Sequence, residues 1–292
     1  MSKENGLKPY DPRLALIGRC VDCRRDSMVP VESGFECDVC GRKYEFDEDG
    51  ILRAFPETGL FPLPSIYNTP DFKRWVEVWE EMIPNWNIYK TRFRRLFSMS
   101  GHRKTRGFIE RYVAPDIPVI DMGCGHGQLF QVLAPERCVG LDANLKFLRV
   151  LKKRFPEALA IHGDFSSVPF ASGCLQCVVS LHTLEHLYFL AESLEEVKRA
   201  LAPEGFFFFS IPTEGGIGWE LGRCLITGPY LKRRYNMSVR KIMDIEHINN
   251  ARRVLKFLGF YFDIAKTMYA PFSFIRSLHV NASISGVARH KK

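Results

Sequence analysis

Four cysteines near the start of the chain have the spacing of a metal site. They form two C-x-x-C pairs about a dozen residues apart, Cys20 with Cys23 and Cys37 with Cys40. Zn²⁺ prefers soft ligands in a tetrahedron, and the two-residue spacing lets one tight turn present two sulfurs. Unrelated buried cysteines or a redox C-x-x-C pair are alternatives that explain less of this pattern. We expect a structural zinc, because the four thiolates leave no coordination position open.

A glycine-rich loop follows an apolar run at residues 118–121. Gly123, Gly125 and Gly127 alternate with other residues directly after Asp121. Glycine lets the backbone turn sharply and approach a ligand, and a helix over 128–133 would point its amide N–H groups at that ligand. The dinucleotide fingerprint G-x-G-x-x-G is not met, because the third glycine comes one residue early. This spacing argues against a nicotinamide dehydrogenase.

Acidic residues end the next two apolar runs. Asp142 ends the run at 138–142, where a carboxylate can accept both hydroxyls of a ribose, and Asp164 follows the run at 158–161, where it can accept from an adenine amine. The carboxyl ends of parallel strands meet at one edge of a sheet, so these two carboxylates and Asp121 would converge on one crevice. The alternative is that each carboxylate only caps a helix.

The elements that must position these residues alternate regularly from residue 117 onward. Short apolar runs and helical stretches follow one another, which predicts an α/β fold with a parallel sheet covered on both faces. The expected strands are 118–121, 138–142, 158–161, 175–181 and 206–211. The expected helices are 128–133, 144–155, 193–201 (opening in a capping box of Ser193 and Glu196) and about 245–258, which would end at Gly259.

The composition is that of an ordinary globular protein, with 46% hydrophobic and 25% charged residues among 292. It excludes collagen-like and low-complexity chains. The sequence has no apolar run of about 18 residues and no secretory signal, so we expect a cytoplasmic protein without a transmembrane segment. The formal net charge is +8, from 41 basic and 33 acidic residues, and a tetrathiolate zinc would lower it to +6. A basic balance favours anionic partners.

Residues 56–104 connect the cysteine-rich segment to the sheet. The first part, 56–70, is rich in proline and predicts an extended connector. Two amphipathic helices are then expected, one with the stripe Phe72, Trp75, Val76, Trp79 and Met82 and one with Tyr89, Phe93, Leu96 and Phe97. The second has a basic polar face. These helices either cap the main domain or form an electropositive surface for RNA or another anion.

The motifs at 119–129, 139–142, 163–170 and 178–187, taken in this order, resemble those of class I S-adenosylmethionine-dependent methyltransferases, and most closely the type 11 group. The resemblance covers about 105–292 and implies a seven-stranded, mostly parallel Rossmann-like sheet that ends in an antiparallel hairpin, here 260–269 and 282–288. It implies S-adenosyl-L-methionine as cofactor, with the glycines around the methionine and Asp121 beneath them. Asp142 would hold the ribose, Asp164 the adenine amine with Phe165 beside it, and His182 would border the methionine.

The cysteine-rich segment, 10–55, resembles the small zinc-ribbon subunits that activate tRNA, rRNA and release-factor methyltransferases. This implies a three-part chain: a zinc ribbon (10–55), a linker with cap helices (56–104) and a methyltransferase domain (105–292) with a glycine-rich basic lid at about 212–244. The ribbon points toward RNA, whereas the type 11 group consists mostly of metabolite enzymes.

A methyl acceptor with a hydroxyl or an acidic carbon needs a general base. His182, Glu185 and His247 are our candidates, with His186 and Glu214 as further titratable groups. The signature for methylation of exocyclic amines is absent, since residues 180–183 read Ser-Leu-His-Thr, so DNA is not expected as a substrate. We expect a small or lipid-linked metabolite as acceptor, with rRNA or tRNA as the alternative. A non-catalytic zinc-ribbon scaffold that binds RNA or a partner is the alternative of another class. Oligomeric state is left open.

Overall fold

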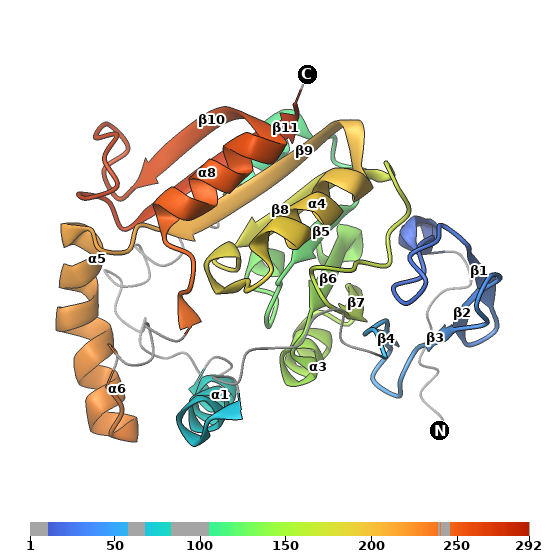
Figure 1. Cartoon of the computed structure of the whole chain (residues 1–292), viewed down its shortest axis with the longest axis horizontal. Coiled ribbons are helices and arrows are strands. Elements are labelled where there is room, and N and C mark those ends of the chain that lie inside the picture. The colour runs from blue at the N-terminus through green and yellow to red at the C-terminus, as the bar shows by residue number, and fades with distance from the viewer. Residues whose placement is uncertain (1–10, 58–67, 83–104, 239, 241–245, 292) are drawn as a thin grey trace.

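An eight-stranded sheet organises the chain in the computed structural model, which describes residues 11–57, 68–82, 105–238, 240 and 246–291. The strand order is β10-β11-β9-β8-β5-β6-β7-β4 (Figure 1). Strands β4 to β9 pair in parallel, and β10 and β11 add an antiparallel hairpin at one edge. The strands are β4 (Ile51–Arg53), β5 (Val119–Met122), β6 (Cys138–Asp142), β7 (Leu159–His162), β8 (Leu175–Leu181), β9 (Leu201–Pro212), β10 (Phe262–Ala270) and β11 (Ser283–His290).

The central strands are apolar on both faces because both faces are covered. In β5, Ile120 and Met122 join one core and Val119 joins the other. Helices α4 (Leu190–Ala200) and α8 (Ala251–Tyr261) cover the first face, and α3 (Leu145–Arg154) covers the second together with the helical residues 105–112 (Figure 1). The expected mostly parallel sheet with a terminal hairpin is confirmed.

The eighth strand comes from the expected zinc ribbon. A separate antiparallel sheet contains β1 (Met28–Val31), β2 (Gly34–Cys37) and β3 (Lys43–Glu45). The chain then continues into β4, which pairs in parallel with β7. Because Ile51 and Leu52 are fully buried there, the cysteine-rich segment shares the core of the main sheet. The sheet therefore has one strand more than the seven we expected.

Three of the predicted helices differ in the structure. Residues 129–131 form only a 3₁₀ turn, so the expected helix 128–133 is absent. Helix α4 begins at Leu190 and buries Ser193, so the predicted capping box was wrong. Helix α8 begins at Ala251 rather than near 245, where the Asn250 side chain caps it by accepting from the Arg253 amide, and it continues to Tyr261 because the backbone at Gly259 remains helical. The predicted helix 144–155 is confirmed as α3, and the Asn144 side chain accepts from the backbone amides that open it.

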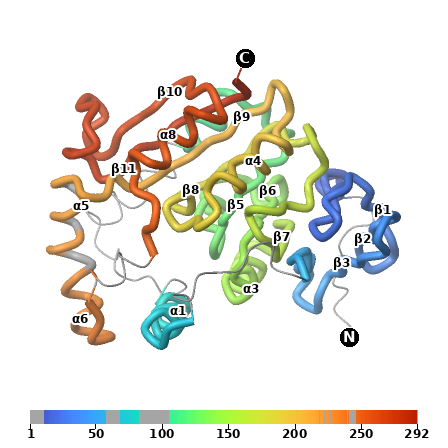
Figure 2. The backbone as a smooth tube through the Cα atoms, viewed as in Figure 1, coloured from blue at the N-terminus to red at the C-terminus, as the bar shows by residue number. Residues whose placement is uncertain are grey.

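A cap of helices lies beside the carboxyl ends of the strands. It consists of α1 (Pro70–Met82), α5 (Ile217–Gly222), a π-helical turn (Arg223–Thr227) and α6 (Gly228–Tyr235), and Figure 2 follows the chain through them. Trp75 and Met82 of α1 pack against Leu231 of α6. The predicted lid is therefore largely helical rather than a glycine loop. The second expected basic helix lies outside the described residues.

Among the helices in these ranges, none combines the length and the apolar character needed to cross a bilayer.

Candidate active site

The loop after β5, residues 123–127, is shaped by three glycines in the left-handed region. Gly123, Gly125 and Gly127 have φ values of 77°, 53° and 79°. A Cβ on Gly123 would lie 2.2 Å from Cγ2 of Thr183, so that position has no room for a side chain. A Cβ on Gly125 would meet no atom of the described residues within 4 Å. The glycine loop therefore packs tightly at one end and faces open space in the middle, where a ligand can approach the backbone.

Asp142 ties the end of β6 to this loop. Its carboxylate accepts from the backbone amides of Gly125 and Asn144, both at 2.8 Å. Burial raises the pKa of Asp142, although these two hydrogen bonds oppose the shift. Each carboxylate oxygen retains a second lone pair, so Asp142 can still accept from a ribose while it holds the loop.

Asp121 lies buried under the glycine loop at the end of β5. Among the described residues, its Oδ1 atom has no hydrogen-bond partner. Burial, with a smaller contribution from Asp142, raises the pKa of Asp121 to about 8. The carboxyl is therefore largely protonated at neutral pH and can donate a hydrogen bond to the loop or to a ligand.

Asp164 and Phe165 follow β7 and continue the same edge of the sheet. The Gly163 amide donates to the Asp142 carbonyl at 3.1 Å, which joins the two strand ends. Asp164 accepts from the backbone amide and the hydroxyl of Ser166, and Phe165 is buried. The structure thus brings the predicted ribose and adenine residues to one edge, and their roles remain predictions.

His182 sits where β8 leaves the sheet. It has a φ of 54°, and its neighbour Thr183 donates to the Gly123 carbonyl at 3.1 Å, so this turn abuts the glycine loop. The His182 side chain is 41% exposed, and its Nδ1 lies 3.8 Å from Oε1 of Glu185. An accessible imidazole beside the buried carboxyl of Glu185 can accept a proton from a bound acceptor.

A cluster of histidines and glutamates extends from this turn. Glu185 is 2% exposed, and burial raises its pKa to about 8. Burial lowers the pKa of His186 to about 4. The His247 ring lies 4.5 Å from the His186 ring, and its Nδ1 contacts Glu214. Glu246 completes the cluster, and the sequence analysis missed it, although its place directly before His247 was the available signal.

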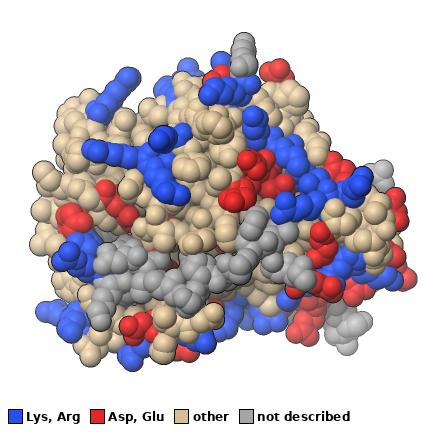
Figure 3. All heavy atoms as spheres, in the orientation of Figure 1, with Lys and Arg blue, Asp and Glu red and all other residues tan. Residues whose placement is uncertain are grey.

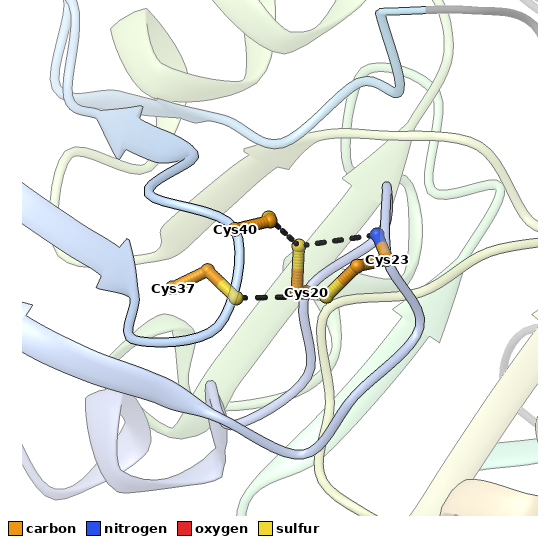
Figure 4. Close-up of side chains that lie close together, drawn as sticks. All are labelled: Cys20, Cys23, Cys37 and Cys40. Carbon is orange, nitrogen blue, oxygen red and sulfur yellow. Dashed lines mark hydrogen bonds between the residues drawn. The ribbon is translucent and has the colours of Figure 1, made fainter.

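The four ribbon cysteines point toward one another (Figure 4). The Sγ atoms of Cys20 and Cys40 lie 3.6 Å apart, as do those of Cys23 and Cys37. Zn–S bonds of about 2.3 Å in a tetrahedron place sulfurs about 3.8 Å apart, so the cluster has the size of a zinc site. The Ser27 hydroxyl lies 3.1 Å from the Cys37 sulfur. The donor set and its spacing fit Zn²⁺.

The ribbon also contacts the predicted adenine side of the crevice. The Ser167 hydroxyl donates to the Val21 carbonyl at 3.1 Å, and Ile17 forms a β-bridge with Phe170. Residues 164–170 therefore lie between the cysteine cluster and Asp142.

Comparisons with known proteins match this part of the chain to a family of methyltransferases. The family model described as "Methyltransferase domain" matches residues 120–209, which contain the glycine loop, Asp142, Asp164 and His182. A probable S-adenosylmethionine-dependent methyltransferase of Mycolicibacterium smegmatis is 29% identical over 40% of this chain and 46% of that protein. The uncharacterized methyltransferase YodH of Bacillus subtilis is 38% identical over 32% of this chain and 42% of that protein. A phthiotriol/phenolphthiotriol dimycocerosates methyltransferase of Mycobacterium tuberculosis is 30% identical over 35% of this chain and 41% of that protein. The chain spans about half the length of the curated relatives it matches.

Proposed function

We propose that this chain, whose residues 120–209 are a class I S-adenosylmethionine-dependent methyltransferase domain, transfers a methyl group to an oxygen or carbon of a lipid-linked metabolite. The observation that carries the proposal is the meeting of the predicted cofactor residues at one edge of the sheet. There the open space beside Gly125 adjoins the carboxylate of Asp142, and the loop of Asp164 follows.

The residues of this edge suit the cofactor chemically. Asp142 would accept the ribose hydroxyls, Asp164 the adenine amine, and the amides of the glycine loop would contact the carboxylate of the methionine. The bound sulfonium supplies a methyl group on a good leaving group, so the protein has to align the acceptor and exclude water. His182, supported by Glu185 at 3.8 Å, would take the proton that an acceptor hydroxyl or acidic carbon loses.

An exposed apolar face on the cap favours an acceptor attached to lipid. Ile217, Leu221 and Leu225 follow at four-residue spacing, and Leu225 is 68% exposed. Phe274 is 82% exposed in the loop between β10 and β11, and the backbone of that loop at residue 278 meets Gly216 just before α5. Adjacent apolar side chains of this size commonly insert at a lipid interface.

Basic residues adjoin this apolar face. Arg223, Lys232 and Arg240 line a cavity of about 360 Å³ between the π-helical turn and the end of α6. Figure 3 shows Lys and Arg side chains beside α6 and over α8 on the same side of the molecule. The combination suits an acceptor with an apolar tail and an anionic group. The named activity of the mycobacterial relative, which concerns a lipid, supports the same class.

The experiment is methyl transfer from labelled S-adenosylmethionine into fractionated cell extract. We expect label in the lipid-extractable fraction. Label in RNA alone would instead support the zinc-ribbon alternative, and no transfer in any fraction would support the scaffold. Leu225→Glu should lower transfer to lipid at least fivefold without changing cofactor affinity. Val29→Glu is the matched control, because Val29 is 42% exposed in β1 of the ribbon, outside the cysteine pairs and away from the cap.

For the cysteine cluster we propose a structural zinc. The sulfur spacing supports it, and the metal would supply folding free energy to a segment with little core of its own, on the order of 10 kcal/mol. Its place beside residues 164–170 makes it a support for the adenine side of the crevice rather than a reaction centre.

A further inference from the structure

Three separate segments bring together a cluster of histidines and glutamates. We call it the His–Glu cluster, and its members are Glu185, His186, Glu214, Glu246 and His247. His186 ends the 3₁₀ turn Leu184–His186, Glu214 follows β9, and residues 246–247 precede α8. One ligand atom each from His186, Glu246 and His247 lies within 4.8 Å of the other two. Two imidazoles and a carboxylate form a donor set that takes a divalent first-row transition ion.

The cluster is held in place by a buried asparagine. The Asn249 amide donates to the Glu185 carbonyl at 3.0 Å, and its side chain donates to the carbonyls of Leu184 and Leu187 at 3.2 and 2.6 Å. These bonds fasten residues 246–249 to the 3₁₀ turn. Ligands from distant segments are thereby preorganised before any ion binds.

The orientation of His186 matches that of a metal ligand. Its Nδ1 lies 3.1 Å from the Glu246 carbonyl oxygen, which can only accept, so Nδ1 carries the proton and Nε2 presents its lone pair. Histidines that bind metals commonly donate their second nitrogen to a backbone carbonyl in this way. Nε2 points to the same region as Oε1 of Glu185, which is 3.8 Å away.

The carboxylates of the cluster lack cationic partners. Within the described part of the chain, Glu185 lies at ion-pair distance only from His182 and His186, and Glu214 only from His247. Glu246 has no ion pair there. Oε2 of Glu185 is buried there without a hydrogen-bond partner, and the neutral indole of Trp75 is the side-chain donor to the Glu246 carboxylate. Burying polar atoms in this state costs free energy, which a bound cation would offset.

We infer that the His–Glu cluster binds a divalent first-row transition metal ion, with His186, His247 and Glu246 as ligands and Glu185 and Glu214 as flanking carboxylates. The turn that carries His186 follows β8 and touches the glycine loop through Thr183. Because β8 lies on one side of β5 and β6, β7 and β4 lie on the other, a bound ion would be on the side of the glycine loop away from the ribbon. Under the proposed function, an acceptor oxygen would occupy the open coordination position. That last step rests on the proposed function, whereas metal binding itself does not.

Metal content of the full chain tests this inference. Purified protein equilibrated with Zn²⁺ and then freed of excess metal should contain two ions per chain, one in the ribbon and one in the cluster. With the ribbon filled by Zn²⁺, added Co²⁺ should give visible d–d bands without the thiolate charge-transfer absorption that a cysteine site produces. One ion per chain, or cobalt bands of thiolate type only, would overturn the inference.

Paired variants locate the second ion. His186→Phe combined with His247→Phe keeps the ring volume and should reduce the content from two ions to one, while the exposed His279→Phe should keep two. Retention of two ions in a folded double variant would contradict the assignment. If the double variant does not fold, the cobalt spectrum of the wild-type protein still decides. Because these measurements use neither cofactor nor acceptor, a separate titration with S-adenosylmethionine distinguishes failure of the proposed function from failure of the metal site.

Discussion

Replacing Asp142 by Ala should affect both the fold and the cofactor site. The carboxylate accepts two backbone hydrogen bonds at 2.8 Å, from Gly125 and Asn144. Hydrogen bonds to a charged group contribute about 1.5–3 kcal/mol each, and the burial that raises the pKa of Asp142 opposes part of this gain. We therefore expect the free energy of unfolding to fall by about 2 kcal/mol, with the protein still folded.

The same variant would lose the acceptor for the ribose hydroxyls. A loss of about 3 kcal/mol corresponds to a Kd for S-adenosylmethionine raised about 100-fold. Calorimetric titration and urea unfolding measure the two effects separately. Asp142→Asn should fall between wild type and Ala in both, because one oxygen remains, and the exposed Asp116→Ala should change neither. An unchanged Kd in folded Asp142→Ala would show that this residue does not bind the cofactor.

Gly123→Ala should lower the free energy of unfolding by about 3 kcal/mol, since left-handed backbone strain adds to a clash with Thr183. Gly125→Ala has only the backbone strain, because its Cβ meets none of the described residues, and should cost about 1 kcal/mol. Equal losses in urea unfolding would argue against this packing. Because the pKa of Asp121 is about 8 in the folded state and about 4 in the unfolded state, between these two pH values the carboxyl is protonated in the folded protein and ionised in the unfolded one. Stability relative to Asp121→Asn should therefore fall as pH rises through that window, by up to about 1.4 kcal/mol per unit, and parallel pH profiles would contradict the shift. Cys20→Ser should remove one zinc per chain and weaken cofactor binding through residues 164–170, and unchanged affinity in the zinc-free protein would show that the ribbon does not support the crevice.

The strands of the sheet could be predicted because burial on both faces makes each of them a continuous apolar run. The acidic residues at their ends then predict that Asp121, Asp142 and Asp164 lie at one edge, because parallel strands end on the same side of a sheet. The cysteine spacing likewise predicted four sulfurs that meet. In each case the signal lies within a few residues of one segment.

Features that depend on distant segments were not predictable. The run Ile51–Arg53 looks like the end of a ribbon, and only its pairing with β7 shows that it extends the main sheet. The expected helix after Gly127 is only the turn Leu129–Gln131, and the chain beyond it is extended at Ala134, before Pro135. Glu246 joins the His–Glu cluster only because Asn249 holds its segment against a turn about 60 residues earlier in the chain.

Binding of S-adenosylmethionine beside the glycine loop underlies the proposed function, and a crystal structure with S-adenosylhomocysteine would show it. We expect the ribose hydroxyls of the ligand to contact Asp142 and its amino-acid end to lie beside Gly125. A ligand bound elsewhere, or a crevice filled by the side chains of the protein at saturating ligand, would contradict it.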